Sequence, residues 1–219
     1  MKEYAAILRK CGLFDGIEEN DLYAMLDCIG ANLAEYGAGE YIFREGDEAK
    51  ELGIVLSGMV EIERSDFDGN RTILARFESS QIFGESFACA GVKSIPINAR
   101  AVTDCEILMI DAGKITATCC SACAFHVKAV SNLLKLVSMR NILFHEKIEV
   151  TSRRTTRDKL LAYLGLQAKK AGRKNFRIAF DRKDLADYLE VDRSGLSAEI
   201  SKLRREGIIE SRKNEFTLL

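Results

Sequence analysis

The chain has 219 residues, of which 47% are hydrophobic and 30% charged, with a formal net charge of −1. This length suits one medium domain and one small domain, so we expect two. No stretch approaches the ~18 apolar residues of a membrane span, and the start MKEYAAILRKCG lacks the apolar run of a secretory signal. We therefore expect a cytoplasmic protein with no membrane contact.

The residue types give catalysis little to work with. Of the two histidines, neither stands beside a serine nucleophile motif, and no GxxxxGK loop is present to cradle a phosphate. We therefore do not expect an enzyme. The seven cysteines are an odd number in a chain expected in a reducing compartment, which also argues against a disulfide framework.

The first 120 residues begin with helical periodicity and then turn to β structure. Leu22, Met25, Leu26 and Ile29 share one face of a predicted helix. Short apolar runs between glycine-containing turns then predict strands over residues 41–43, 53–57, 59–63, 72–77, 98–102 and 106–110. Short strands at this spacing predict a barrel or roll. Pro96 precedes a strand, where its missing N–H costs no ladder bond.

A long helix is predicted over residues 122–149, which contain neither glycine nor proline. At ~1.5 Å per residue it would be about 40 Å long. Apolar residues recur in steps of four and three, which is typical of a coiled-coil seam through Val130, Leu134, Val137, Asn141, Phe144 and Ile148. We expect a symmetric dimer along this seam, in which Asn141 costs stability and fixes the register. The alternative is that the stripe packs on its own β domain.

Two short helices separated by a tight turn are predicted between Arg182 and Ile209, a helix-turn-helix. Their buried faces are formed by Leu185, Ala186 and Leu189 in the first and by Leu196, Ile200 and Leu203 in the second. Asp192 stands at the N-cap of the second helix, which therefore begins at Arg193. The outer face of that helix then carries Ser194, Ala198, Ser201 and Arg205, with Arg193 and Ser197 on its flanks.

Two further strands, over residues 208–211 and 215–218, would form a wing with the basic tip Arg212, Lys213 and Asn214. The alternative is that these helices and strands merely close a small domain and bind nothing. The charge distribution argues against that alternative. From residue 151 onward 17 Lys and Arg face 10 Asp and Glu, a net charge of +7, which leaves −8 for residues 1–150. A basic module joined to an acidic domain is what attraction to DNA phosphate requires.

The motifs GAGEYIFREGD, VLSGMVEI and IFGES, followed by the long helix and the helix-turn-helix, resemble the cyclic AMP receptor protein and fumarate-nitrate regulator (CRP/FNR) superfamily over nearly the whole chain. The resemblance implies an α+β protein with a cyclic-nucleotide-binding-like β-roll, or jelly roll, for effector sensing over residues 1–121. It further implies a dimerisation helix over residues 122–150 and a winged helix-turn-helix over residues 151–219.

The implied function is a homodimeric, sequence-specific DNA-binding transcriptional regulator, controlled by an effector or redox signal at the N-terminal domain. Its partners would be DNA with a two-fold symmetric operator, a second copy of the chain and RNA polymerase. The alternative is a constitutive DNA-binding dimer whose β-roll is only a structural or partner-interaction module.

The chain departs from the cyclic AMP-binding members at the positions that hold the nucleotide. The effector pocket implied by the resemblance comprises Gly84, Glu85, Ser86, Ile95, Pro96, Leu143 and Phe144. Gly84 and Glu85 match, but Ile95 and Pro96 stand where nucleotide binders carry a phosphate-contacting arginine and a serine. Leu143 and Phe144 replace the hydroxyls that face the base. We therefore expect no physiological cyclic AMP binding, because the charge-assisted bond to the phosphate is lost.

The positions of the cysteines do not identify a cofactor. The clustered N-terminal cysteines of the iron-sulfur members are not matched, since this chain has only Cys11 and Cys28 there and Leu108 at the fourth ligand position. A second candidate for an iron-sulfur cluster, a haem or another metal is the group Cys119, Cys120, Cys123 and His126. The alternative is that cysteines simply pack as small apolar residues, as we expect of Cys89 and Cys105.

In the DNA module, the family's base-reading positions correspond to Arg193, Ser194, Ser197 and Ala198. Ala198 departs from the guanine-reading arginine of many relatives, so Arg193 becomes the expected guanine reader. Contacts to phosphate are expected from Arg182, Lys202, Arg212 and Lys213, with further candidates at Arg153, Arg154, Arg157 and Arg205.

Overall fold

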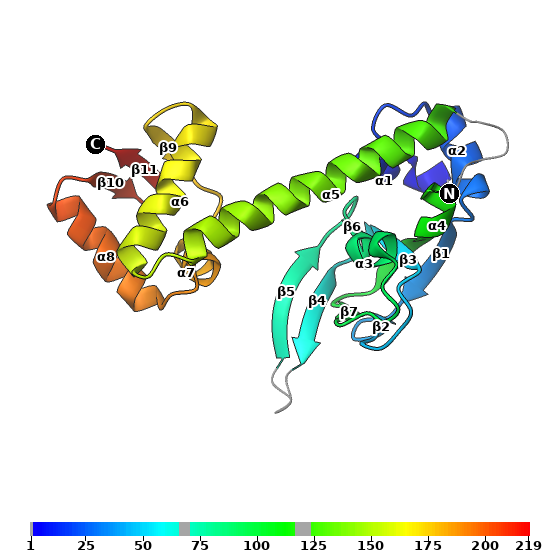
Figure 1. Cartoon of the computed structure of the whole chain (residues 1–219), viewed down its shortest axis with the longest axis horizontal. Helices are drawn as coiled ribbons and strands as arrows, with labels where there is room; N and C mark the ends of the chain where they lie inside the picture. The colour runs from blue at the N-terminus through cyan, green and yellow to red at the C-terminus, as the bar shows by residue number, and fades with distance from the viewer. Residues whose placement is uncertain (1, 66–70, 117–123) are drawn as a thin grey trace. The chain divides into compact units, whose positions relative to one another are not determined.

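The computed structural model describes residues 2–65, 71–116 and 124–219 (Figure 1). The chain divides into two compact units, Met1–Ser138 and Met139–Leu219. The long helix contributes to both, and the functional division at residues 121 and 150 stays a prediction. None of the described helices is long and apolar enough to cross a membrane.

Short helical segments open the first unit. They are the 3-10 helices η1 (Lys2–Tyr4) and η2 (Gly12–Phe14) and the α-helices α1 (Ala5–Leu8) and α2 (Glu19–Cys28). The apolar face predicted for α2 is confirmed, because Leu22, Met25, Leu26 and Ile29 are all buried. This face makes the N-terminal segment part of the core of the first unit.

Two four-stranded antiparallel sheets form the β-roll (Figure 1). The first has the order β1 (Asn32–Tyr36), β8 (Cys105–Asp111), β3 (Glu51–Ser57) and β6 (Ile82–Phe83). The second has the order β2 (Tyr41–Phe43), β7 (Asn98–Ala101), β4 (Val60–Ser65) and β5 (Arg71–Phe77). Helices α3 (Glu85–Ala90) and α4 (Ala112–Thr116) follow β6 and β8 along the chain.

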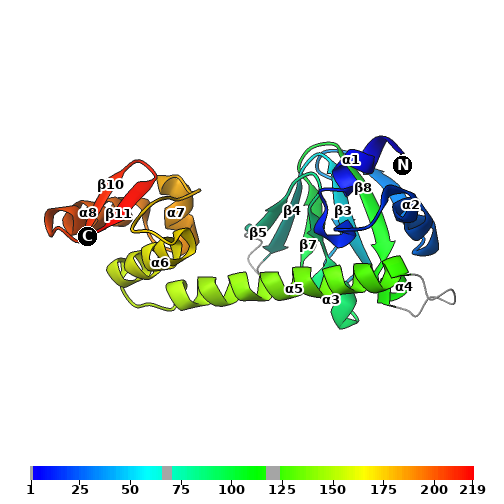
Figure 2. The same cartoon turned by 90° about the horizontal axis from the view of Figure 1, so that it is seen from above.

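The first sheet is buried on both faces, which explains the nearly continuous apolar runs of β3 and β8. On one face Ile54 and Leu108 join a core made with the N-terminal helices and the start of the long helix (Figure 2). On the other face Val55 and Ile107 join the core between the two sheets. In a strand that is buried on both faces, polar and apolar residues do not alternate. The sequence therefore predicts the extent of such a strand only from the length of its apolar run.

Helix α5 (Ala124–Thr151) is the predicted long helix, and it ends two residues later than expected. The predicted start at residue 122 lies outside the described residues. In its first half Ala129 and Leu133 are buried in the core that the first sheet forms with the N-terminal helices. Asn132 is also buried, and its Nδ2 donates to the backbone carbonyls of Leu13 (3.0 Å) and Asp15 (2.8 Å). The α5 helix is therefore tied to the N-terminal segment as well as to the sheet.

The second unit holds a three-stranded sheet and three further helices. In chain order these are α6 (Thr156–Ala171), β9 (Asn175–Arg177), α7 (Arg182–Leu189), α8 (Arg193–Arg205), β10 (Ile209–Arg212) and β11 (Glu215–Leu218). The sheet has the order β10-β11-β9 and is antiparallel. This is the winged helix-turn-helix that the sequence predicts.

The strands predicted for the β-roll are all present, with ends that differ by one or two residues. The first wing strand was predicted at residues 208–211 and lies at Ile209–Arg212, so Arg212 belongs to the strand and not to the turn. Strands β1, β6 and β9 were not predicted. They are short or lie at a sheet edge, where few apolar residues alternate.

Candidate DNA-binding and effector sites

The helix-turn-helix is built on a single apolar core. The predicted faces of α7 and α8 are confirmed, since all six of their residues are buried: Leu185, Ala186, Leu189, Leu196, Ile200 and Leu203. They pack with Tyr163 of α6 and with Phe176 and Phe216 of the wing sheet. The opposite face of α8 is therefore held outward by packing that spans the whole module.

The start of α8 is capped as predicted. The carboxylate of Asp192 accepts the backbone N–H of Gly195 at 2.8 Å and the hydroxyl of Ser194. These two hydrogen bonds hold the pKa of Asp192 below its usual range. The cap fixes the direction in which the first turn of α8 leaves the tight turn.

The outward face of α8 is polar and open. Arg193, Ser194, Ser197, Ala198 and Lys202 are all exposed. The hydroxyl of Ser197 donates to the carbonyl of Arg193 at 2.9 Å, so it is satisfied within the helix. The N-terminal end of α8 thus presents one long cation, two hydroxyls and a methyl group, which are groups that can meet base edges in a major groove.

The other predicted phosphate contacts differ in exposure. Arg212 and Lys213 are exposed at the wing, whereas Arg182 is only partly exposed at the start of α7. Arg157, a further candidate, is engaged elsewhere. Its guanidinium pairs with Glu199 at 3.3 Å and Glu206 at 2.5 Å, which ties α6 to α8 and makes it a structural residue.

In the β-roll, Gly84 and Glu85 form the turn into α3. Gly84 has a φ of +79°, and a Cβ there would lie 3.0 Å from the ring of Phe43, so glycine is required. Glu85 is buried and accepts a hydrogen bond from the hydroxyl of Ser86 at 3.1 Å, while Ser86 itself is exposed. This part of the family pattern is kept as a turn.

The position of the missing arginine is filled by apolar packing. Ile95 is 2% exposed and lies in the same core as Phe43 and Phe83, whose rings are 5.8 Å apart. Its backbone N–H and C=O bond to Asp47 and Gly46 at 2.8 and 2.9 Å. Pro96 is exposed beside it. The residues present therefore do not fit a cyclic phosphate, which needs a charged donor at this place.

Leu143 and Phe144 lie on the part of α5 that belongs to the second unit, and both are exposed. Within the described residues neither joins the core between the two sheets. Their apolar side chains offer no hydroxyl to a base.

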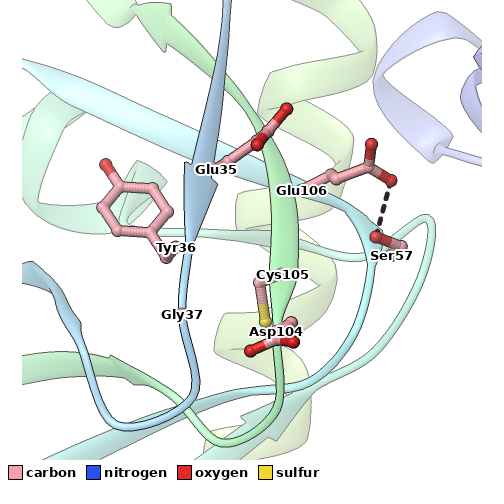
Figure 3. Close-up of a pocket in the computed structure, with 7 residues that line it drawn as sticks. All are labelled: Glu35, Tyr36, Gly37, Ser57, Asp104, Cys105 and Glu106. Carbon is pink, nitrogen blue, oxygen red and sulfur yellow. Dashed lines mark hydrogen bonds between the residues drawn. The ribbon is translucent and has the colours of Figure 1, made fainter.

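A hollow of about 670 Å³ lies at one end of the first sheet, where β1 and β3 end and β8 begins (Figure 3). Glu35, Asp104 and Glu106 line it, together with Tyr36, Gly37, Ser57 and Cys105. Glu106 accepts hydrogen bonds from the hydroxyls of Tyr4 (2.5 Å) and Ser57 (2.7 Å), and both bonds hold the pKa of Glu106 low. The bond to Glu106 also raises the pKa of Tyr4 to about 12. Three carboxylates make this hollow unsuitable for an anionic nucleotide. The hydrogen bond from Tyr4 to Glu106 links the N-terminal segment to β8.

The metal candidates Cys119, Cys120 and Cys123 lie outside the described residues. His126 is described: it is 6% exposed and its Nδ1 has no hydrogen-bond partner among the described residues. In the part of the chain that the structure covers, no group of three or more His, Cys, Asp or Glu side chains could hold a metal ion. The metal site therefore stays a prediction.

The other cysteines behave differently from one another. Cys11 is buried, and desolvation raises the pKa of its thiol to about 11, so it does not suit a thiolate ligand. Cys105 is buried as expected, but Cys89 is exposed, so the expectation that it packs as a small apolar residue was wrong. Cys89 follows the turn that Gly84 begins and sits on the outer side of the short α3.

An antiparallel β-roll, a long helix and a winged helix-turn-helix with an exposed polar recognition face define a class of DNA-binding proteins with a sensing domain. Residues 33–121 match the family model of the cyclic nucleotide-binding domain, and residues 158–219 match that of the Crp-like helix-turn-helix domain. The chain belongs to the CRP/FNR superfamily of transcriptional regulators.

The chain is 26% identical to an anaerobic regulatory protein of Bacillus subtilis (strain 168) over 195 residues, which are 87% of this chain and 80% of the relative. Two solved structures share the fold. The c-di-GMP responsive regulator CLP of Xanthomonas campestris has a TM-score of 0.57 at 19% identity over 92% of this chain and 99% of its own. DNR from Pseudomonas aeruginosa has a TM-score of 0.52 at 21% identity over 100% and 95%.

With these relatives the chain is a DNA-binding transcriptional regulator whose N-terminal domain senses a signal. The alternative of a constitutive binding protein with a purely structural β-roll is not favoured. The resemblance stated from the motifs is thereby confirmed at the level of family, fold and broad function.

Proposed function

We propose that this chain is a homodimeric regulator that binds a two-fold symmetric operator and responds to a signal other than cyclic AMP. In this proposal the exposed start of α8 reads bases through Arg193, Ser194, Ser197 and Ala198. Phosphate contacts come from Arg182, Lys202, Arg212 and Lys213. Arg193 is the principal guanine reader, because Ala198 cannot donate a hydrogen bond from its side chain.

The observation that carries the proposal is an exposed apolar row along α5. Leu134, Phe144 and Ile148 are 68%, 64% and 61% exposed, and Val130 is also exposed. Val127, at 71%, extends the same alternation of three and four residues by one step. A row of this length is costly to leave in water, and a second α5 would cover it by knobs-into-holes packing.

Two positions of the row differ from the others, one because it is partly buried and one because it is polar. Val137 packs partly against the core of the sensing domain, and Asn141 is exposed. The alternative, in which the whole row packs on its own β domain, is therefore not supported. Asn141 would face its copy across the two-fold axis and disfavour other registers.

The proposed mechanism is a shift between dimer states. A signal that binds one state more tightly favours the geometry in which the two recognition helices stand ~34 Å apart, one turn of DNA. The packed position of Ile95 supports a signal other than cyclic AMP. We expect no catalysis, a cytoplasmic location and contact with RNA polymerase, as befits a transcriptional regulator.

The test combines light scattering with selection of bound duplexes from a random DNA pool. We expect a dimer in solution and an inverted repeat in the selected DNA. Leu134→Glu should produce a monomer, because two carboxylates would face each other in an apolar seam, and affinity for the selected repeat should fall by at least about 100-fold.

Met139→Glu is the matched control, since Met139 is exposed on α5 and, at ~100° per residue, lies on the side of the helix opposite the apolar row. It adds the same charge and should leave the dimer intact. A monomeric wild-type protein, or a Leu134→Glu variant that stays dimeric and keeps its affinity, would contradict the proposal.

A further inference from the structure

Three serines lie on the exposed side of the recognition helix α8. Ser194, Ser197 and Ser201 follow one another in steps of three and four residues, so their side chains form one row along the outer face. All three are exposed. A serine hydroxyl is able to donate to a base or to accept from one, so the residue type alone does not tell which bases it fits. The hydrogen bonds that these hydroxyls form within the protein decide between the two cases.

Two of the three hydroxyls direct their proton into the helix itself. The hydroxyl of Ser197 donates to the carbonyl of Arg193 at 2.9 Å, and that of Ser201 donates to the carbonyl of Ser197 at 2.9 Å. Because a carbonyl oxygen has no proton, the serine is the donor in both bonds. The side of each hydroxyl that faces away from the helix therefore carries only lone pairs.

Ser194 directs its proton to the N-cap of α8. Its hydroxyl donates to the carboxylate of Asp192, and this bond is the largest of the effects that hold the pKa of Asp192 below its usual range. The carboxylate is therefore ionised at neutral pH and has no proton to donate. The same carboxylate also accepts the backbone N–H of Gly195 at 2.8 Å. Ser194 thus resembles Ser197 in having its proton on the protein side and lone pairs on the outer side.

A serine of this kind gains more from accepting than from donating when it meets DNA. If Ser197 donated to a base, its bond to the carbonyl of Arg193 would break as the new bond formed, and the number of hydrogen bonds would stay the same. If Ser197 accepts from a base, the bond within the helix is kept and one bond is added. One net hydrogen bond corresponds to about three- to tenfold in affinity. The accepting arrangement is favoured by that factor.

The major-groove edges of the four bases differ in whether they offer a donor to such an acceptor. Cytosine presents its 4-amino group and adenine its 6-amino group, whereas guanine presents only acceptors, and thymine presents an acceptor and a methyl group. Arg193 has the opposite character to the serines, because a guanidinium only donates. The first turn of α8 therefore combines a donor that suits guanine with acceptors that suit the amino-bearing bases.

We propose that Ser194 and Ser197 act as hydrogen-bond acceptors toward DNA, and that the bases they contact are cytosine or adenine, which carry an exocyclic amino group. The inference rests on the proposed function, in which these two residues face base edges. It adds the chemical class of the bases, which the residue types alone leave open.

The test removes single groups from the bases of the operator that the wild-type protein selects from random DNA. The duplexes are altered at the base pair whose preference changes in Ser197→Ala. An adenine there is replaced by unsubstituted purine, or a cytosine by pyrimidin-2-one, so that the amino group is lost. A second set of duplexes carries a 7-deazapurine at the same pair, which lacks only the acceptor N7. Fluorescence anisotropy at fixed salt measures the affinity.

Loss of the amino group should lower the affinity of the wild-type protein about three- to tenfold, whereas the 7-deazapurine should leave it unchanged. The Ser197→Ala variant should bind the amino-free and the normal duplex equally, which separates the contact from any effect on base pairing. The same comparison applies to Ser194→Ala at the base pair that it affects.

Ser201→Ala is the matched control, because it removes the same kind of bond to a backbone carbonyl one helical turn beyond Ser197. It should respond to the amino-free duplex as the wild-type protein does. If the 7-deazapurine weakens binding and loss of the amino group does not, Ser197 donates and the inference is wrong, although DNA binding stands. The inference is equally wrong if Ser197→Ala changes no base preference. If the wild-type protein selects no sequence from the random pool, the proposed function itself fails.

Discussion

The two ends of the molecule keep the family pattern to different degrees. In the helix-turn-helix the apolar face is buried and the reading face stays polar and exposed. In the β-roll the turn at Gly84 is kept, but the place of the phosphate-contacting arginine is occupied by Ile95 in a closed apolar core. The fold of the β-roll thus does not depend on an arginine at this place, because Ile95 joins the apolar core between the two sheets.

The largest expected effect is a loss of stability in the β-roll. Ile95→Arg restores the residue type of the nucleotide binders but places a guanidinium in an apolar core. We expect a loss of about 3–5 kcal/mol in the free energy of unfolding, because the charge is buried without a designed partner. Urea unfolding measures it.

Ser94→Arg is the control for Ile95→Arg, since Ser94 is exposed and its substitution adds the same charge next to the core. A stable Ile95→Arg protein that gains cyclic AMP binding would reverse the interpretation. It would mean that the pocket is intact and lacks only its guanidinium.

A smaller effect is expected in the DNA-binding module, on the discrimination between bases. Arg193→Ala should cost ~1–3 kcal/mol of discrimination at one base pair of each half-site while leaving the fold unchanged. The measurement is competition between the selected operator and single-base variants at fixed salt. Arg205→Ala, also exposed on α8 but at its far end, should preserve the base preference.

The smallest effect concerns the N-terminal segment and appears only in alkali. The pKa of Cys11 is raised to about 11 from 9.0, so the folded state favours the protonated thiol. This contribution to stability is complete below pH 9 and is lost as the pH rises towards 11. At pH 10 the loss amounts to about 1.4 kcal/mol.

The Cys11→Ala variant has no thiol at this position, so its stability does not depend on the ionisation of Cys11 and it is the control for the wild-type protein. The difference in unfolding free energy between the wild-type protein and this variant should shrink between pH 8.5 and pH 10, roughly by the amount above. A constant difference across this range would show that the Cys11 thiol is not desolvated.

The predictions that held rest on strong local patterns. The start of α8 was predicted at the correct residue, because two signals coincide there. Asp192 is the N-cap, and Leu196, Ile200 and Leu203 follow at helical spacing and are buried. The strands of the β-roll have apolar runs between glycine turns, which mark them even where neither face is polar.

What was missed depends on distant parts of the chain. β1 has little apolar pattern of its own. It pairs with β8, and the paired residues are 77 apart in sequence for Asn32 with Met109 and 69 apart for Tyr36 with Cys105. Arg157 is a surface arginine in sequence, and only the fold brings Glu199 and Glu206 to it. Long-range pairing of this kind leaves no periodic trace.

The double hydrogen bond of Asn132 to the carbonyls of Leu13 and Asp15 bears on where the sensing domain begins as a folding unit. The family match starts at residue 33, at the first strand. A fragment cut there would lose the helices that cover one face of the first sheet and would leave a buried amide on α5 without its acceptors. The structural unit of the sensing domain is therefore larger than the region that matches the family model, because residues 4–29 share its core.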